Sequence, residues 1–312
     1  AKKYAYMIVL DMITILKTYP SVRDVKIPDG GEITVCGDVH GQYYDLLNIW
    51  EMNGLPAEDN PYVFNGDFVD RGPDGVEVLA AVLGMKLAFP RHVHINRGNH
   101  EDAALSRAYD FEAELVSKYG VDTSLLDDAD DAFAAMPLGC VVNHGASRTM
   151  VLHGHLPRSL PSLDELKRAP RVRSVVAESE EDVEVVRDIL WSDPWDQSDV
   201  VDNFKRNAGC LIPDGALGEW LQREKFVRLV RSHETEATGA AVTPVPHDAT
   251  MGRASALKSK PLASNARRIS SADLNVLSSL SNSPKNTFLL PGMCPERTPS
   301  VSYTHLRAHE TH

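Results

Sequence analysis

The chain has 312 residues, which is enough for one large domain with a tail or for two small domains. Its formal net charge of −12 at pH 7 argues against nucleic acid as a partner, and no apolar run approaches the roughly 20 residues of a membrane-spanning helix. The cysteines are widely spaced, which favours reduced thiols and a cytoplasmic or nuclear location over a disulfide framework (Cys36, Cys140, Cys210 and Cys294).

The first hundred residues alternate between helical and strand patterns. In chain order, we predict a helix over 4–18, a strand over 33–36, a helix over 41–51, a strand over 62–64, a helix over 73–87 and a strand over 92–95. Strands that alternate with helices in this way indicate βαβ units. Such units form a sheet whose faces are covered by helices.

The second part of the chain has weaker patterns. In chain order, we predict a helix over 102–118, an acidic solvent-facing segment over 120–136, a hairpin over 141–152, a helix with a loop over 162–187 and a strand over 226–230. Residues 235–312 are rich in Ala, Ser, Thr and Pro and have no sustained period, so we expect a low-complexity, disordered tail. Because the chain begins with Ala1 rather than Met, we expect a fragment or a processed product.

Polar motifs directly follow three of the predicted strands. They are Gly37-Asp38-Val39-His40-Gly41, Gly66-Asp67-Phe68-Val69-Asp70-Arg71-Gly72 and Arg97-Gly98-Asn99-His100-Glu101. In open α/β sheets, sites form beyond the carboxyl ends of the strands. Carboxylate and amide oxygens mixed with imidazoles suit first-row divalent ions such as Mn, Fe or Zn. The three motifs therefore indicate one divalent metal site.

The same motifs resemble the signatures of the phosphoprotein phosphatases, a family of metal-dependent serine/threonine phosphatases. The stretch from Ile33 to Phe89 is most similar to the protein phosphatase 5 subfamily, and residues 97–102 and 206–210 share features with the EF-hand-bearing members. The resemblance covers about residues 2–234. It implies an α/β fold of the metallophosphoesterase type, with a βαβαβ metal-binding scaffold in a central β-sandwich flanked by helices.

The resemblance also implies two divalent metal ions (Mn, Fe or Zn) as cofactors. Asp38 and His40 complete the first metal site, Asn99, His153 and His233 complete the second, and the central Asp67 bridges both ions. The amide oxygen of Asn99 is suited to its role because it ligates without adding a negative charge. A hydroxide activated by the two metals is expected to attack phosphorus in line.

Four further residues resemble the catalytic and phosphate-binding groups of the family. His100 matches the general acid, and Asp70 is expected to orient it and to favour its protonated form. Arg71 and Arg206, together with Asn99, are expected to hold the phosphate oxygens, because a planar guanidinium binds them in a fork geometry. The implied enzyme is a hydrolase that dephosphorylates serine and threonine in phosphoprotein substrates, with regulatory proteins as further partners.

Two departures from the family pattern concern the support of the site. His155 stands where the family has a second glycine after His153, and a side chain there is expected to crowd the turn. The family motif Ser-Ala-Pro-Asn-Tyr-Cys is not found after Glu234, so we expect a catalytic domain over 1–234 whose closing strands are missing. Two other functions stay open, namely a catalytically impaired phosphoprotein-binding module and a metallophosphoesterase acting on small phosphate esters.

Overall fold

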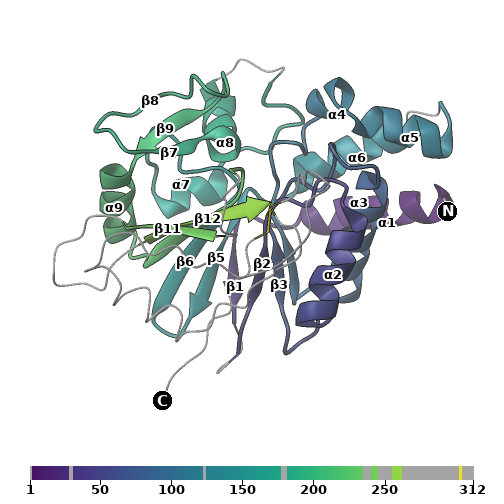
Figure 1. Cartoon of the computed structure of the whole chain (residues 1–312), viewed down its shortest axis with the longest axis horizontal. Coiled ribbons are helices and arrows are strands. Elements are labelled where there is room, and N and C mark those ends of the chain that lie inside the picture. Colours follow the sequence, from purple (N-terminus) through teal and green to yellow (C-terminus); the bar gives the residue numbers. More distant parts are fainter. Residues whose placement is uncertain are drawn as a thin grey trace, which may run out of the picture.

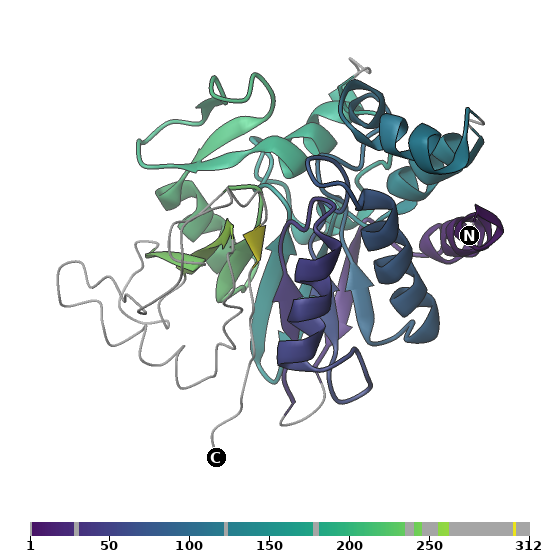
Figure 2. The ribbon, with the colours of Figure 1, turned by 45° about the vertical axis from the view of Figure 1, so that its right-hand side comes forward.

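Two β-sheets pack face to face at the centre of the molecule, and helices cover their outer faces (Figures 1 and 2). This computed structural model describes residues 2–27, 31–121, 124–176, 181–234, 240–244, 255–261 and 302–303. The predicted α/β fold, a central sandwich flanked by helices, is confirmed.

The first sheet consists of parallel strands in the order β2-β3-β4. Their bounds are Thr34–Cys36 for β2, Tyr62–Phe64 for β3 and Val93–Ile95 for β4. These strands are buried on both faces, which accounts for their short continuous apolar sequences. The outer face packs in one apolar core against α1 (Lys2–Leu16), α2 (Tyr43–Asn53), α3 (Gly75–Ala88) and α6 (Ser124–Ala135).

The second sheet has the order β1-β5-β6-β10-β12-β11, with β13 beside β12. The strands are β1 (Val22–Lys26), β5 (Gly139–His144), β6 (Ser147–Leu152), β10 (Arg228–Arg231), β11 (Ala240–Pro244), β12 (Ser255–Pro261) and β13 (Ser302–Tyr303). Its outer face packs against α7 (Leu163–Arg168), α8 (Glu181–Trp191) and α9 (Asp214–Arg223). The predicted hairpin is the antiparallel pair of β5 and β6.

Branched apolar side chains fill the space between the two sheets. Val35 and Val63 from the first sheet meet Val142, Val151 and Val230 from the second in a single buried cluster. A small third sheet lies at one end of the sandwich, made of β7 (Asp193–Trp195), β9 (Cys210–Pro213) and β8 (Val201–Asp202). Helices α4 (Leu105–Ala108) and α5 (Phe111–Tyr119) lie on the opposite side of the same end (Figure 1).

Two of the predicted elements differ from the structure. The helix expected over 102–118 is divided into α4 and α5, because the chain turns at Tyr109 and directs the backbone N–H groups of Asp110 and Phe111 to the Asp70 carboxylate. The acidic segment forms α6, but not all of it faces solvent. Asp130 is fully buried, where it accepts a hydrogen bond from Ser106 and pairs with Arg107.

Beyond Glu234, the described residues continue the second sheet. Strand β12 pairs in parallel with β10, and β11 pairs with β12 in antiparallel orientation. The rest of the expected tail lies outside the described residues. The domain boundary at residue 234 and the disordered tail therefore stay predictions. Among the described helices, none is long and apolar enough to cross a membrane.

Candidate active site

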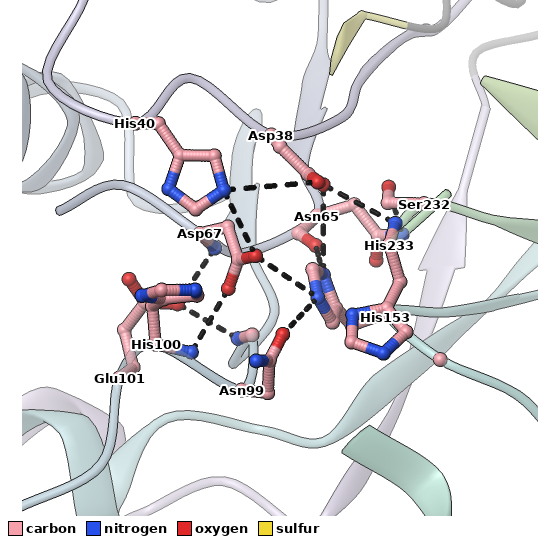
Figure 3. Close-up of polar contacts among 12 residues, drawn as sticks. Asp38, His40, Asn65, Asp67, Asn99, His100, Glu101, His153, Ser232 and His233 are labelled. Carbon is pink, nitrogen blue, oxygen red and sulfur yellow. Dashed lines mark hydrogen bonds and ion pairs between the residues drawn. The ribbon is translucent and has the colours of Figure 1, made fainter. Parts of the chain in front are cut away.

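Loops that follow five strands converge at one end of the sandwich and carry buried polar side chains (Figure 3). Asp38 and His40 follow β2, Asp67 follows β3, Asn99 follows β4, His153 follows β6 and His233 follows β10. The structure thus brings together all the residues that the sequence proposed as metal ligands. Parallel strands end at the same edge of a sheet, which explains why ligands far apart in the chain meet here.

The backbone of these loops is strained at the functional residues. His40, Asp67 and His233 have φ values of 43°, 55° and 74°, in the left-handed region that side chains other than glycine rarely adopt. Such conformations cost on the order of 1–3 kcal/mol each and persist only where the surroundings enforce them. Next to Asp67, Gly66 has a φ of 88°, and a Cβ there would lie 2.3 Å from the backbone nitrogen of Gly98.

Glu101 holds two of these strained loops together. Its fully buried carboxylate accepts hydrogen bonds from the backbone N–H groups of Asp67 at 2.7 Å, Phe68 at 2.8 Å and Gly98 at 2.8 Å. A carboxylate that accepts several N–H bonds makes charge-assisted hydrogen bonds, which are stronger than neutral ones. Glu101 therefore fixes the loop after β3 against the loop after β4.

The Asp67 carboxylate lies at the centre of the site. Its Oδ2 is 3.3 Å from Nε2 of His40 and 3.4 Å from Nε2 of His153. Its Oδ1 accepts the backbone N–H of His100 at 3.0 Å, which fixes the plane of the carboxylate. Asp38 lies at the rim of the same group, 4.0 Å from Nε2 of His40. The Asp67 carboxylate thus contacts one histidine from each of the two proposed metal sites.

His153 and its neighbours form the second half of the site. Oδ1 of Asn99 is 2.9 Å from Nε2 of His153. The ring of His233 crosses that of His153 with centroids 5.0 Å apart. His233 also meets the indole of Trp191 edge-on at 5.8 Å. Among the described residues, Asp67, His153 and His233 therefore offer ligand atoms within 4.8 Å of one another.

Unpaired imidazole nitrogens show that the site is suited to metal ions. Nε2 of His40 and Nε2 of His233 are buried and have no hydrogen-bond partner among the described residues. Nδ1 of His40 bonds the carbonyl of Val69 at 2.8 Å, and Nδ1 of His153 bonds that of Asn65 at 2.8 Å, so each Nε2 is directed at the Asp67 carboxylate. Buried nitrogens without partners are costly, and two metals that share Asp67 would satisfy them.

The charges of the site are strongly coupled. Burial alone would raise the pKa of Asp67, but His153, His100 and His40 hold it well below its usual value. Burial would likewise lower the pKa of His153, yet the nearby Asp67 carboxylate raises it to about 9. Burial and the negative charge of Asp67 raise the pKa of Asp38. The carboxylates thus attract positive charge into this buried site.

A hydrogen-bonded histidine–aspartate pair lies beside the proposed metal ligands. Nδ1 of His100 is 2.7 Å from Oδ2 of Asp70, and both residues are buried. The exposed Arg71 places Nη2 3.4 Å from Nε2 of His100. The half-exposed ring of Tyr109 packs edge-on against His100 with centroids 5.1 Å apart. With Nδ1 bonded to Asp70, Nε2 of the imidazole lies beside the guanidinium of Arg71.

Arg206 is held by Asp193, a residue outside the proposed ligand set. Its Nε and Nη2 bond the carboxylate of Asp193, and Nη2 also donates to the carbonyl of His233 at 2.9 Å. The Asp193 carboxylate additionally accepts Nη2 of the buried Arg231 at 2.7 Å. Arg206 is thus held beside a proposed metal ligand, with Nη1 unpaired among the described residues. Its predicted contact with phosphate stays a prediction.

The supporting contacts of several residues were not predicted from the sequence. Glu101, Asn65 and Asp193 act through backbone groups or through other polar side chains, and no spacing rule indicates such contacts. For Asn65, the one sequence signal of a supporting role was a polar residue directly after the apolar run of β3. His155 is buried at the turn after β6, in place of the glycine that the family pattern has there.

The sequence of the chain matches one protein family and is similar to known protein phosphatases. Residues 31–236 match the Calcineurin-like phosphoesterase family. Serine/threonine-protein phosphatase 5 of Solanum lycopersicum is 40% identical over 239 residues, which are 76% of this chain and 41% of the relative. Serine/threonine-protein phosphatase with EF-hands 1 of Mus musculus is 31% identical over 278 residues, 77% of this chain and 42% of the relative. The chain therefore spans less than half the length of these relatives.

A solved structure resembles the chain over most of its length. It is a protein serine/threonine phosphatase from Saccharomyces cerevisiae with similarity to human phosphatase PP5. The TM-score is 0.73 at 28% sequence identity, and the match covers 84% of this chain and 78% of that one. The resemblance of the sequence motifs to the phosphoprotein phosphatases, nearest to protein phosphatase 5, is thereby confirmed.

Proposed function

The chain belongs to the Calcineurin-like phosphoesterase family, and on this basis we propose that it is a protein serine/threonine phosphatase acting on phosphoserine and phosphothreonine. One observation carries the proposal. The Asp67 carboxylate lies between His40 and His153, at 3.3 Å and 3.4 Å, directly beside the pair of His100 and Asp70. A carboxylate shared by two sites next to a histidine acid is the arrangement that metal-assisted ester hydrolysis requires.

Two divalent metal ions are the proposed cofactors, with Mn, Fe or Zn as the metals that the donor set suits. Asp38 and His40 would hold one ion, Asn99, His153 and His233 would hold the other, and Asp67 would contact both. When bound, the pair supplies a nucleophile from water near neutral pH and neutralises charge on the phosphoryl group.

The remaining residues of the site bind the phosphate and move a proton. Arg71 is exposed beside His100, where its guanidinium can bind two phosphate oxygens in a fork. Arg206 offers Nη1 from the other side, held in place by Asp193. His100, oriented by Asp70, donates a proton from Nε2 to the departing seryl or threonyl oxygen. No covalent phosphoenzyme is needed, because water is the nucleophile.

The proposed substrates are phosphoproteins, with regulatory proteins as further partners and the cytoplasm or nucleus as the location. We place the catalytic unit within residues 1–234, because every proposed metal ligand precedes residue 235. A metallophosphoesterase for small phosphate esters would use the same groups. A binding module without turnover would keep the phosphate contacts and lack the metal pair.

An activity assay on the 312-residue chain distinguishes these functions. The chain is stripped of metal, supplied with Mn²⁺ and offered a phosphoserine peptide, a phosphothreonine peptide and p-nitrophenyl phosphate, with EDTA as the control. We expect Mn²⁺-dependent turnover of both peptides. Turnover of only the small ester would favour the metallophosphoesterase. Peptide binding without turnover of any substrate would favour the binding module.

A further inference from the structure

Two buried asparagines lie directly beneath the candidate metal site. Asn65 follows β3 and Asn96 follows β4, and their side chains are 0% and 1% exposed. Nδ2 of Asn96 donates to Oδ1 of Asn65 at 2.8 Å. We refer to these two side chains as the amide pair. A buried amide without a partner is costly, so this bond determines which way the Asn65 amide faces.

The nitrogen of the Asn65 side chain reaches across the sandwich to the second sheet. It donates one hydrogen to the carbonyl of Leu152 at 2.8 Å and the other to Oγ of Ser232 at 2.9 Å. Leu152 directly precedes His153, and Ser232 directly precedes His233. Both donor hydrogens of Asn65 are therefore used on the residues next to two proposed metal ligands (Figure 3).

The main chain of Asn65 makes further contacts with the same segments. Its carbonyl accepts a hydrogen bond from Nδ1 of His153 at 2.8 Å, which leaves Nε2 of that ring for a metal. The backbone N–H of Ser232 donates to the carbonyl of His153 at 2.9 Å, so the segments after β6 and β10 are also joined to each other. Asp67 itself lies two residues beyond Asn65.

From these contacts we infer that the amide pair of Asn65 and Asn96 is a positioning device that sets the ligands Asn99, His153 and His233 against Asp67. This inference rests on the two-metal site of the proposed function. Asn65 touches the segments of His153 and His233, and Asn96 lies three residues before Asn99 on the same loop. Each ligand of one proposed ion is therefore connected to the pair.

The ligands of the other proposed ion depend on the pair much less. The ring of His40 is held by the carbonyl of Val69, and neither His40 nor Asp38 has a side-chain hydrogen bond to the amide pair among the described residues. Among the described residues, the direct link is the backbone bond from the N–H of Asn65 to the carbonyl of Cys36 at 2.8 Å. Asp38 also meets the other ligands, because its Oδ1 accepts the backbone N–H of His233 at 3.4 Å. The pair should therefore affect the affinity for one ion much more than the affinity for the other.

Isosteric variants separate positioning from a general effect on folding. Asn65→Asp keeps the size of the side chain but replaces the amide nitrogen with an acceptor that faces the carbonyl of Leu152. Ser232→Ala removes a single acceptor of Asn65. Asn53→Asp is the matched control, because Asn53 is 2% exposed, donates Nδ2 to the carbonyl of Ile49 at 2.9 Å and is not part of the candidate site.

The experiment titrates Mn²⁺ into the metal-stripped 312-residue chain and its variants by calorimetry and by electron paramagnetic resonance. The unmodified chain should bind two Mn²⁺. Asn65→Asp should raise one dissociation constant about 10–100-fold and change the other by a much smaller factor, as expected for residues that orient the ligands of one metal. Ser232→Ala should raise the same constant by less, and it carries the test if Asn65→Asp does not fold. Asn53→Asp should lower the melting temperature with both constants unchanged.

The other possible outcomes would contradict either the positioning role of the amide pair or the two-metal function. Folded Asn65→Asp and Ser232→Ala chains that bind both ions normally would contradict the inference alone, and so would equal weakening of both ions. An unmodified chain that binds fewer than two Mn²⁺ would contradict the two-metal function and, with it, this inference.

Discussion

The imidazole of His100 is held by Asp70, whose Oδ2 lies 2.7 Å from its Nδ1 and whose Oδ1 accepts the backbone N–H of Phe111 at 2.9 Å. Asp70 thus connects the start of helix α5 to the ring, and its φ of 67° shows that the backbone is strained to place it there. Because Nδ1 is occupied by Asp70, only Nε2 is available to a substrate. This geometry leads to the first prediction.

Replacing His100 with Asn should reduce turnover of a phosphoserine peptide about 10²–10⁴-fold, because removal of a general acid typically costs that much. Mn²⁺ content should be unchanged, since in our assignment His100 is not a metal ligand. The loss should be smaller for p-nitrophenyl phosphate, whose leaving group needs less protonation. His144→Asn, at the end of β5, is the control. Equal losses on both substrates would argue against the acid role.

Replacing Asp67 with Asn should weaken both metals at once, because a neutral amide takes the place of the shared carboxylate. The chain should then lose the protection that Mn²⁺ gives against thermal unfolding. That protection is expected to be about 3–4 kcal/mol at 100 to 1,000 times the dissociation constant. Metal analysis and melting curves with and without Mn²⁺ test this. Retention of two metals by the variant would show that Asp67 does not bridge them.

Most of the candidate site could be predicted from the sequence because its residues follow strands. Asp38, Asp67 and Asn99 each lie in a short polar segment that follows an apolar run, and the rule that parallel strands end together places them at one edge. His153 and His233 are different. They follow strands that pair with other segments of the chain, and only the resemblance to a family could assign them to the same site.

The contacts that support the site could not be predicted for a physical reason. Glu101 binds three backbone N–H groups, and any residue can supply such a group. Strand β1 was missed because it has only five residues, of which three are charged and two are valines that do not alternate with them. Asp130 lies among other acidic residues, and its contacts with Ser106 and Arg107 of another helix explain its burial. Each of these features depends on long-range packing.

Replacing Glu101 with Gln should loosen the loops after β3 and β4 together. The amide nitrogen of glutamine cannot accept a hydrogen bond, so at least one of the N–H groups of Asp67, Phe68 and Gly98 loses its partner. A buried N–H without a partner should cost about 1–3 kcal/mol in the free energy of unfolding. Mn²⁺ affinity should fall as well, because Asp67 is displaced. Exposed Glu219→Gln is the control, and equal behaviour of the two variants would contradict the assigned role.

Lys86 predicts how the stability of the chain changes with pH. Its side chain is fully buried at the end of α3, where Nζ donates to the carbonyl of Pro90 and lies 5.2 Å from the centre of the Tyr19 ring. The guanidinium of Arg23 covers the same ring at 3.5 Å, and no carboxylate of the described residues pairs with Lys86. Burial, together with the charge of Arg23, lowers the pKa of Lys86 to about 7.

The sign of the effect follows from the number of protons that each state binds. The unfolded chain has an ordinary lysine with a pKa near 10.4, so between about pH 7 and pH 10 it binds one more proton than the folded chain. The free energy of unfolding should therefore rise with pH in this window, by at most about 1.4 kcal/mol per pH unit from Lys86. Lys86→Met should remove this slope and stabilise the chain near pH 7, because no charge is buried.

Urea unfolding of the metal-stripped chain at pH 7, 8, 9 and 10 measures the slope, with exposed Lys26→Met as the control. Parallel slopes for Lys86→Met and the unmodified chain would show that Lys86 keeps its charge in the folded state.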